Sequence, residues 1–195
     1  RSTQGVSSAA SDVYKRQLLV EIGMSHPDWP QQIYEVFKSL DVRQVSYVPD
    51  AGHSALIRLC EGDPGMHSVS LTTEEEGVAM SAGAWLGGDR AALLLQSSGV
   101  GNCINMLSLQ HEARMPLFMI VTMRGEWGEF NPWQIAMGKS TQAVLEASGV
   151  YVYRADQAEE IAANVDAGAR FAYQTGRSVA VLIGQRVIGT KNFNK

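Results

Sequence analysis

Short apolar runs alternate with helical patterns along most of this 195-residue chain. The clearest run, residues 91–95, is almost unbroken in apolar character, which is typical of a strand buried on both faces of a parallel sheet. The other β-rich runs are 45–48, 67–71, 116–123, 150–153 and 178–183. The segments with helical spacing are 29–40, 54–60, 74–86, 101–113, 142–147 and 158–173. This alternation predicts an α/β fold: a single three-layer αβα domain with a mostly parallel, doubly wound sheet.

Composition limits the class of protein. The chain is 45% hydrophobic and 18% charged, which is typical of one globular domain of ordinary size. Its net charge is −4 without a block of Lys or Arg, so we expect no nucleic-acid partner. No apolar run approaches the roughly 18 residues of a membrane span. The two cysteines, Cys60 and Cys103, form neither a disulfide framework nor a CxxC zinc pair, which favours a reduced, cytoplasmic setting.

Residues 1–17 differ from the rest of the chain. They are rich in Ser, Ala and other polar residues, show no sustained apolar period, and lack the apolar core of a signal peptide. We predict that 1–17 are a disordered or non-native extension, and we assign 18–195 to one domain.

Three unusual segments and one acid fall at the carboxyl ends of predicted strands. The segments are 49–53, 96–102 and 124–134, and the acid is Glu74. In open parallel sheets, ligands bind beyond the carboxyl ends of the strands. A long irregular stretch such as 124–139 is uncommon unless it serves a site. The sequence therefore predicts a ligand site at this edge.

The run of three glutamates at 74–76 has two explanations. Thr73 as N-cap with Glu76 three residues later forms a capping box, and acids stabilise a helix start by about 0.3–1 kcal/mol. Alternatively, one glutamate is a buried acid with a chemical role, because the helix that follows carries almost no other polar residue and should be deeply packed. The residues alone leave both explanations open.

Residues 96–102 form a glycine-bearing strand-to-helix turn. Such a turn lets backbone N–H groups approach a ligand and suits a phosphate. The segment is neither a Walker loop, since it lacks Gly-Lys-Ser/Thr, nor a GxGxxG fingerprint. A tight turn with a serine cap explains it equally well.

Two segments taken together resemble the thiamine-diphosphate-dependent decarboxylases. They are residues 74–83 (EEEGVAMSAG) and 94–105 (LLQSSGVGNCIN). The resemblance is closest to the pyrimidine-binding half of phosphonopyruvate decarboxylases and to sulfopyruvate decarboxylase alpha subunits. Residues 47–50 (YVPD) and the loop 124–138 also resemble this family, and the similarity runs from about Leu18 to Gly184. It implies the pyrimidine-binding fold of these enzymes.

The resemblance assigns a role to one glutamate. The family's acid lies nine residues before the glycine that ends its alanine-rich segment, and counting back from Gly83 gives Glu74. In the family this acid hydrogen-bonds the N1′ nitrogen of the cofactor's aminopyrimidine ring and so activates the thiazolium. The cofactor-binding residues that the resemblance implies are Glu74, Gln96, Ser98, Gly99, Gly101 and Asn102. The implied substrate-binding residues are Asp50, His53, Arg124 and Gln134.

The family's metal and diphosphate motif is missing. In these enzymes the diphosphate and its Mg²⁺ are held by a domain that carries Gly-Asp-Gly, and this chain contains no such motif. The resemblance therefore implies no metal ligands in this chain, a beta subunit that holds the diphosphate and Mg²⁺, and a hetero-oligomer built on dimers.

The substrate and loop residues have plainer explanations as well. Arg124 could clamp a sulfonate, phosphonate or carboxylate, or be a surface arginine. His53 could handle a proton near the substrate, or simply begin a helix. Cys103 and His111 lie about 12 Å apart by helical rise, too far for a thiol-hydrolase pair. The loop tryptophans could roof a site, or serve packing or a subunit interface.

We therefore expect the alpha subunit of a thiamine-diphosphate-dependent 2-oxo-acid decarboxylase, with sulfopyruvate or phosphonopyruvate as substrate and carbon dioxide and an aldehyde as products. A non-catalytic binding or scaffolding subunit with the same fold is the alternative. A third hypothesis is a single-chain, flavodoxin-like nucleotide-binding protein, which should bind its ligand without a partner.

Overall fold

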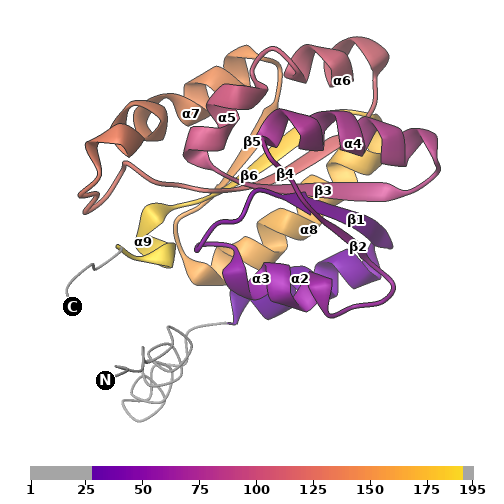
Figure 1. Ribbon diagram of the computed structural model, residues 1–195, viewed down its shortest axis with the longest axis horizontal. Coiled ribbons are helices and arrows are strands. Elements are labelled where there is room, and N and C mark those ends of the chain that lie inside the picture. Colours follow the sequence, from indigo (N-terminus) through magenta and orange to yellow (C-terminus); the bar gives the residue numbers. More distant parts are fainter. Residues whose placement is uncertain (1–27, 191–195) are drawn as a thin grey trace, which may run out of the picture.

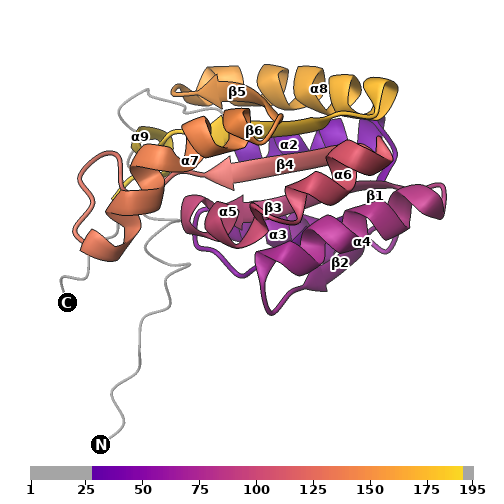
Figure 2. The ribbon, with the colours of Figure 1, turned by 90° about the horizontal axis from the view of Figure 1, so that it is seen from above.

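The computed structural model describes residues 28–190 and contains one parallel six-stranded sheet with helices on both faces (Figures 1 and 2). The strands pair in the order β2-β1-β3-β4-β6-β5, and every pairing is parallel. The strands are β1 (Val42–Tyr47), β2 (His67–Ser70), β3 (Arg90–Gln96), β4 (Leu117–Thr122), β5 (Tyr151–Ala155) and β6 (Ser178–Ile183). This confirms the predicted α/β fold. The prediction for residues 1–17 lies outside the described residues.

The helices divide between the two faces of the sheet (Figure 1). Below it in that view lie α2 (Trp29–Ser39), α3 (Ser54–Glu61) and α8 (Ala158–Thr175). Above it lie α4 (Glu74–Leu86), α5 (Ser97–Cys103), α6 (Leu107–Ala113) and α7 (Ile135–Ala147). The short helices η1 (Pro132–Gln134) and α9 (Gln185–Ile188) lie near the carboxyl ends of the strands.

The central strands are apolar because both of their faces are covered. Alternate side chains of β3 enter different cores, since a strand places successive residues on opposite faces. Ala92 and Leu94 pack with α2, α3 and α8, whereas Leu93 and Leu95 pack with α4 to α6. Strands β4 and β6 are likewise buried along their whole length. The unbroken apolar runs of the sequence correspond to these strands.

Close packing fixes the start of α4. A Cβ atom added to Gly77 would lie 2.4 Å from Leu93 Cδ1, so this turn of the helix sits against β3 more closely than a side chain would allow. Helix α4 follows β2, so it begins at the carboxyl edge of the sheet, and its first residue is Glu74.

Two helix boundaries differ from the prediction. The predicted helix 101–113 is two helices, because α5 already begins at Ser97 and a turn separates it from α6. Helix α7 begins at Ile135, so the irregular segment is shorter than predicted. Gly99 and Gly101 lie inside α5, where glycine's low helix propensity hides the helix from sequence analysis. Packing of α5 between α4 and α7 stabilises it nonetheless.

Candidate active site

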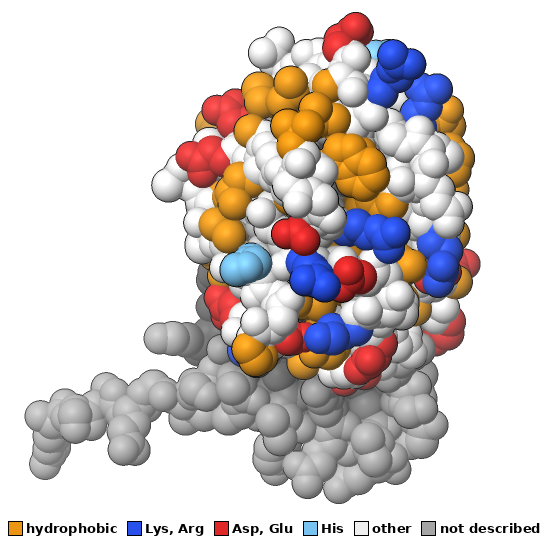
Figure 3. Space-filling view, turned by 90° about the vertical axis from the view of Figure 1, so that its right-hand side faces the viewer, with side chains coloured by type: hydrophobic (Ala, Val, Ile, Leu, Met, Phe, Trp, Pro, Cys, Tyr) orange, Lys and Arg blue, Asp and Glu red, His pale blue; other side chains and the backbone are white. Residues whose placement is uncertain are grey.

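The polar side chains of interest gather where the strands end. Helix α4 follows β2 and α5 follows β3, and Figure 2 shows the starts of both helices at the same edge of the sheet as the arrowhead of β4. The opposite end of the sheet carries interspersed acidic, basic and apolar side chains (Figure 3).

Glu74 is the buried member of the glutamate run. Its residue is 8% exposed, whereas Glu75 and Glu76 are exposed. Asn102 Nδ2 donates a hydrogen bond of 2.8 Å to Glu74 Oε2. A Cβ atom added to Gly99 would lie 2.3 Å from Glu74 Oε1, so the carboxylate rests on the bare backbone of this glycine. Gly99 and Asn102 of α5 therefore together form the seat of the Glu74 carboxylate.

Glu76 performs the capping that the sequence suggested, but through a different residue. Thr73 is the N-cap, yet its side chain makes no capping hydrogen bond. Glu76 Oε2 instead accepts from the Thr72 backbone N–H at 3.0 Å, and Oε1 accepts from Thr72 Oγ1 at 2.6 Å. These hydrogen bonds from Thr72 lower the pKa of Glu76. The predicted Thr73–Glu76 capping box is thus wrong in its partner, and Glu74 takes no part in capping.

Asp50 joins the ends of three strands. Its Oδ1 accepts from Gln96 Nε2 at 2.9 Å, and its Oδ2 accepts from Thr122 Oγ1 at 2.7 Å. The backbone N–H of Gly52 donates to the same Oδ2 at 3.1 Å. Thr122 was not predicted from the sequence, although a lone hydroxyl as the last residue of an apolar strand at this edge is a usable signal. Asp50 and Gln96 therefore form one hydrogen-bonded group.

The Asp50 carboxylate stays ionised, and the hydrogen bonds around it extend to α5. Burial is the largest influence on its pKa and raises it, but the nearby His53 and the three donors together outweigh burial, so the pKa of Asp50 lies below its usual value. Ser98 Oγ donates to Gln96 Oε1 at 3.0 Å, which connects this group to the first turn of α5. The structure thus brings Asp50, Gln96 and Ser98 together, as predicted neighbours at one edge.

His53 lies beneath this edge. Its side chain is fully buried, and Nε2 is 3.2 Å from Leu95 O and 3.1 Å from Ile120 O. Both partners only accept, so Nε2 carries the hydrogen and donates. Burial lowers the pKa of His53, which favours the neutral ring. The ring therefore joins the ends of β3 and β4 rather than standing among the side chains that face outward, which is not the position expected of a substrate contact.

Arg124, for which the sequence left an anion clamp and a surface arginine as alternatives, is buried and paired with Glu129. Its Nε and Nη2 donate to the two oxygens of Glu129, each at 2.7 Å, and the two side chains are 7% and 3% exposed. The hydrogen bond from Arg124 is the main reason that the pKa of Glu129 falls to about 2. Glu129, five residues later in the loop, thus occupies the two guanidinium N–H groups that would otherwise be available to bind a substrate anion.

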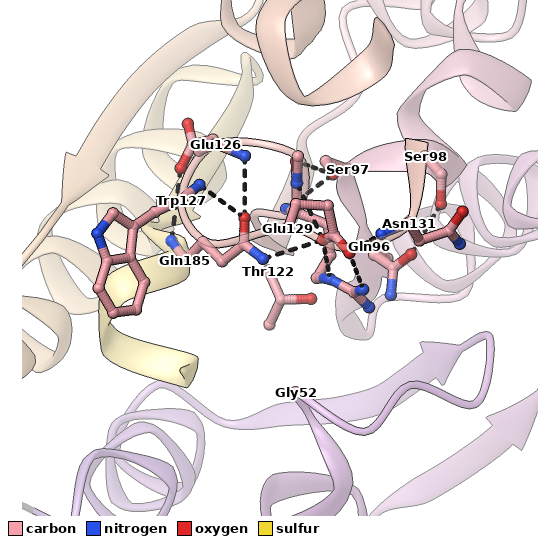
Figure 4. A network of polar contacts seen from close by, with 12 residues as sticks. Gly52, Gln96, Ser97, Ser98, Thr122, Glu126, Trp127, Glu129, Asn131 and Gln185 are labelled. Atoms are coloured by element: carbon pink, nitrogen blue, oxygen red, sulfur yellow. Dashed lines mark hydrogen bonds and ion pairs between the residues drawn. The ribbon is translucent and has the colours of Figure 1, made fainter. Parts of the chain in front are cut away.

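Glu129 and Gln185 hold the loop in one shape (Figure 4). Glu129 also accepts from the backbone N–H groups of Gly125 and Asn131 and from Gln185 Nε2 at 2.9 Å. Gln185 Oε1 accepts from the backbone N–H of Glu126 at 2.9 Å and from that of Trp127 at 3.0 Å. Sequence reasoning did not identify Glu129 or Gln185 as anchors. The segment is consequently ordered by its own polar contacts.

The remaining predicted residues lie around this loop. Gln134 is the N-cap of α7, and its Oε1 is buried without a hydrogen-bond partner among residues 28–190. Trp127 is 46% exposed, with the guanidinium of Arg186 5.7 Å from its ring centre, and Trp133 is 85% exposed. Gly101 lies in α5 beside Met137, whose Sδ would be 3.3 Å from an added Cβ atom.

Across residues 28–190, neither a reactive thiol nor a cluster of metal-binding side chains accompanies these residues. Cys103 is buried, and burial raises the pKa of its thiol to about 12, which suits an inert core residue. Within the described part of the chain, no group of three or more His, Cys, Asp or Glu side chains could hold a metal ion. None of the helices there is long and apolar enough to cross a membrane.

The parallel sheet with a polar site at its carboxyl edge defines the class of ligand-binding α/β domains. A solved structure with this fold is 2-oxoglutarate:ferredoxin oxidoreductase from Magnetococcus marinus, which carries 2-oxoglutarate, coenzyme A and succinyl-CoA. The match has a TM-score of 0.65 at 13% identity and covers 82% of this chain but 29% of that chain. No family model matches the sequence.

Curated relatives are more specific. The chain is 32% identical over 151 residues to sulfopyruvate decarboxylase subunit alpha of Methanocaldococcus jannaschii, which covers 77% of this chain and 89% of the relative. The corresponding protein of Methanothermobacter thermautotrophicus is 31% identical over 157 residues, with 80% and 95% covered. Phosphonopyruvate decarboxylase of Streptomyces viridochromogenes is 40% identical over 109 residues, which span 55% of this chain and only 28% of that protein. The chain belongs to the family of sulfopyruvate decarboxylase alpha subunits, which confirms the resemblance seen in the sequence.

Proposed function

We propose that this chain is the alpha subunit of a thiamine-diphosphate-dependent 2-oxo-acid decarboxylase that acts on sulfopyruvate or phosphonopyruvate and releases carbon dioxide and an aldehyde. The observation that carries the proposal is the seat of Glu74. Of three adjacent glutamates, the one that the family spacing selects is the one that is buried and held against α5.

The residues present fit the pyrimidine ring of the cofactor. Glu74 Oε2 is bonded to Asn102, whereas Oε1 has no hydrogen-bond partner among residues 28–190. This oxygen lies 2.3 Å from where a Cβ atom of residue 99 would be, so the glycine leaves room for the Glu74 carboxylate itself. Glu74 would hold the proton shared with the ring nitrogen, and the partly buried position would keep water away from it. When bound, thiamine diphosphate supplies the electron sink for the loss of carbon dioxide.

The rest of the active site belongs to a partner. The chain contains no Gly-Asp-Gly motif for a diphosphate and its metal ion. The relatives are named as alpha subunits, which supports a beta subunit that carries the diphosphate-binding half and Mg²⁺. We place the assembled enzyme in the cytoplasm, in keeping with two free, buried cysteines.

We expect this chain to contribute Asp50, Gln96 and Gln134 to the substrate site. Asp50 and Gln96 hold a fixed polar surface at the ends of β1 and β3. The buried oxygen of Gln134, which has no hydrogen-bond partner in the described part of the chain, could accept from a donor on a ligand or on the partner subunit. Because Arg124 is committed to Glu129, we expect the anionic end of the substrate to rely on other cations.

Calorimetry with thiamine diphosphate and Mg²⁺ tests this proposal. The chain and its beta subunit together should bind the cofactor, and the chain alone should bind it far more weakly. The matched variants Glu74→Ala and Glu75→Ala should differ, because only the buried glutamate faces the ring. Binding by the chain alone would favour the single-chain, flavodoxin-like hypothesis instead, and no binding even by the assembled pair would favour a scaffolding subunit.

A further inference from the structure

We infer that Asn102 is a positioning residue for Glu74: its side-chain amide fixes which carboxylate oxygen of Glu74 is presented to a ligand, and Gly99 provides the surface against which that carboxylate is held. This inference rests on the proposed function and refines the prediction that Asn102 contacts the cofactor.

The direction of the contact follows from the chemistry of the two groups. An ionised carboxylate only accepts hydrogen bonds, so the amide nitrogen of Asn102, rather than its oxygen, faces Glu74 Oε2 at 2.8 Å. Hydrogen bonds to a charged acceptor are stronger than those between neutral groups. Asn102 itself is exposed, and among residues 28–190 its side chain hydrogen-bonds only to Glu74. Its side chain therefore serves the carboxylate and not the core.

The geometry of α5 brings both elements of the seat to one side. Gly99 and Asn102 are three residues apart, so they lie on the same face of the helix. This face meets the start of α4, where Glu74 is the first residue. A Cβ atom added to Gly99 would overlap Oε1, Cδ and Cγ of Glu74, and the asparagine donates to Oε2.

Helix α5 is itself anchored, which makes the seat rigid. Ser97 Oγ accepts from the Arg124 backbone N–H at 3.0 Å, and Thr141 Oγ1 lies 3.3 Å from Ser97 O. The first residue of α5 is thereby tied to the end of β4 and to α7. A glutamate held on such a support has fixed oxygens, of which one is hydrogen-bonded and the other has no hydrogen-bond partner within the described range 28–190. Without Asn102 the carboxylate would be free to rotate about its last side-chain torsion.

The contact can be measured without cofactor. In the ¹⁵N-labelled full chain, the side-chain amide of Asn102 should give a downfield-shifted proton that moves upfield in Glu74→Ala. The exposed pair Gln142–Glu146, with its amide-to-carboxylate hydrogen bond of 2.9 Å, is the matched control. Glu146→Ala should move the Gln142 amide signals and leave those of Asn102 in place. Asn102 signals that are unchanged by Glu74→Ala would overturn the inference.

A double-mutant cycle in the two-subunit enzyme tests the consequence. Asn102→Ala should lower kcat by about 10- to 100-fold with little change in KM, because a misplaced catalytic group costs rate in this range. Added to Glu74→Gln, it should lower kcat no further, since both changes remove the same action. Gly99→Ala should resemble Asn102→Ala. If the effects of Asn102→Ala and Glu74→Gln multiply, Asn102 acts independently of Glu74 and the inference is wrong.

The two experiments also separate this inference from the proposed function. Full activity in Glu74→Gln would refute the proposed function, while the amide signals would still report whether Asn102 holds the carboxylate. Conversely, an inactive Glu74→Gln enzyme with unperturbed Asn102 signals would retain the proposed function and remove Asn102 from it.

Discussion

The buried pair of Arg124 and Glu129 should be the main stabilising contact of the loop that borders the site. Glu129 accepts hydrogen bonds from the Arg124 guanidinium, from two backbone N–H groups and from Gln185, and its side chain is 3% exposed. Removing one partner of a deeply buried ion pair costs about 3–5 kcal/mol. Because this pair lies in a loop near the surface, solvent screening lowers the value, and we expect about 2–3 kcal/mol for Glu129→Gln.

Thermal unfolding measures this loss as a fall in the midpoint temperature Tm. For a domain of this size, each kcal/mol corresponds to about 2–4 °C in Tm, so the midpoint should fall by about 4–12 °C. The surface pair of Arg170 and Asp166, 50% and 38% exposed, is the control, and Asp166→Asn should change the midpoint little.

The pH dependence provides a second, independent check. The pKa of Glu129 is lowered from 4.5 to about 2 in the folded chain, chiefly by the hydrogen bond from Arg124. Its contribution to the free energy of unfolding is therefore complete above about pH 5 and is lost as the pH falls toward 2. The stability difference between wild type and Glu129→Gln should shrink over that interval. A variant as stable as wild type at pH 7, or a difference that does not vary with pH, would refute the reasoning.

Two further predictions concern packing and thiol chemistry. Gly77→Ala should destabilise the fold by about 1–3 kcal/mol in urea unfolding, because the new Cβ atom meets Leu93 at 2.4 Å, whereas Gly83→Ala on the same helix has open space and should be neutral or stabilising. Equal effects would contradict this packing. Burial raises the thiol pKa of Cys60 and Cys103 to about 12, so neither should react with a thiol reagent at pH 8 until the chain unfolds. Rapid reaction of the folded chain would show that these sites are open.

The strands were predictable because burial on both faces leaves a direct trace in the sequence. Residues 91–95 became the core of β3, and the order of strands and helices followed from the same pattern. The starts of α5 and α7 were not predictable, since Gly, Ser and Pro there have low helix propensity and only packing against neighbouring helices overrides it. The local sequence does not show which helices will pack against these segments in the folded chain.

The candidate site was predictable in part. Asp50, Gln96 and Ser98 were expected at one edge, because parallel strands place their carboxyl ends together, and the structure joins them by hydrogen bonds. The engagement of Arg124 by Glu129 was not predictable, since an irregular loop gives no rule for which charges meet. The preference for Glu74 over its neighbours came from the family spacing, not from the residues themselves.

The most direct test of the account compares two adjacent glutamates in the enzyme reconstituted with its beta subunit. The measurement is the rate of carbon dioxide release from sulfopyruvate and from phosphonopyruvate for wild type, Glu74→Gln and Glu75→Gln. Both variants keep the size of the side chain and remove one negative charge at the start of α4. We predict that Glu74→Gln loses nearly all activity and that Glu75→Gln, altered at an exposed residue, keeps it. Near wild-type decarboxylation by Glu74→Gln would contradict the central claim.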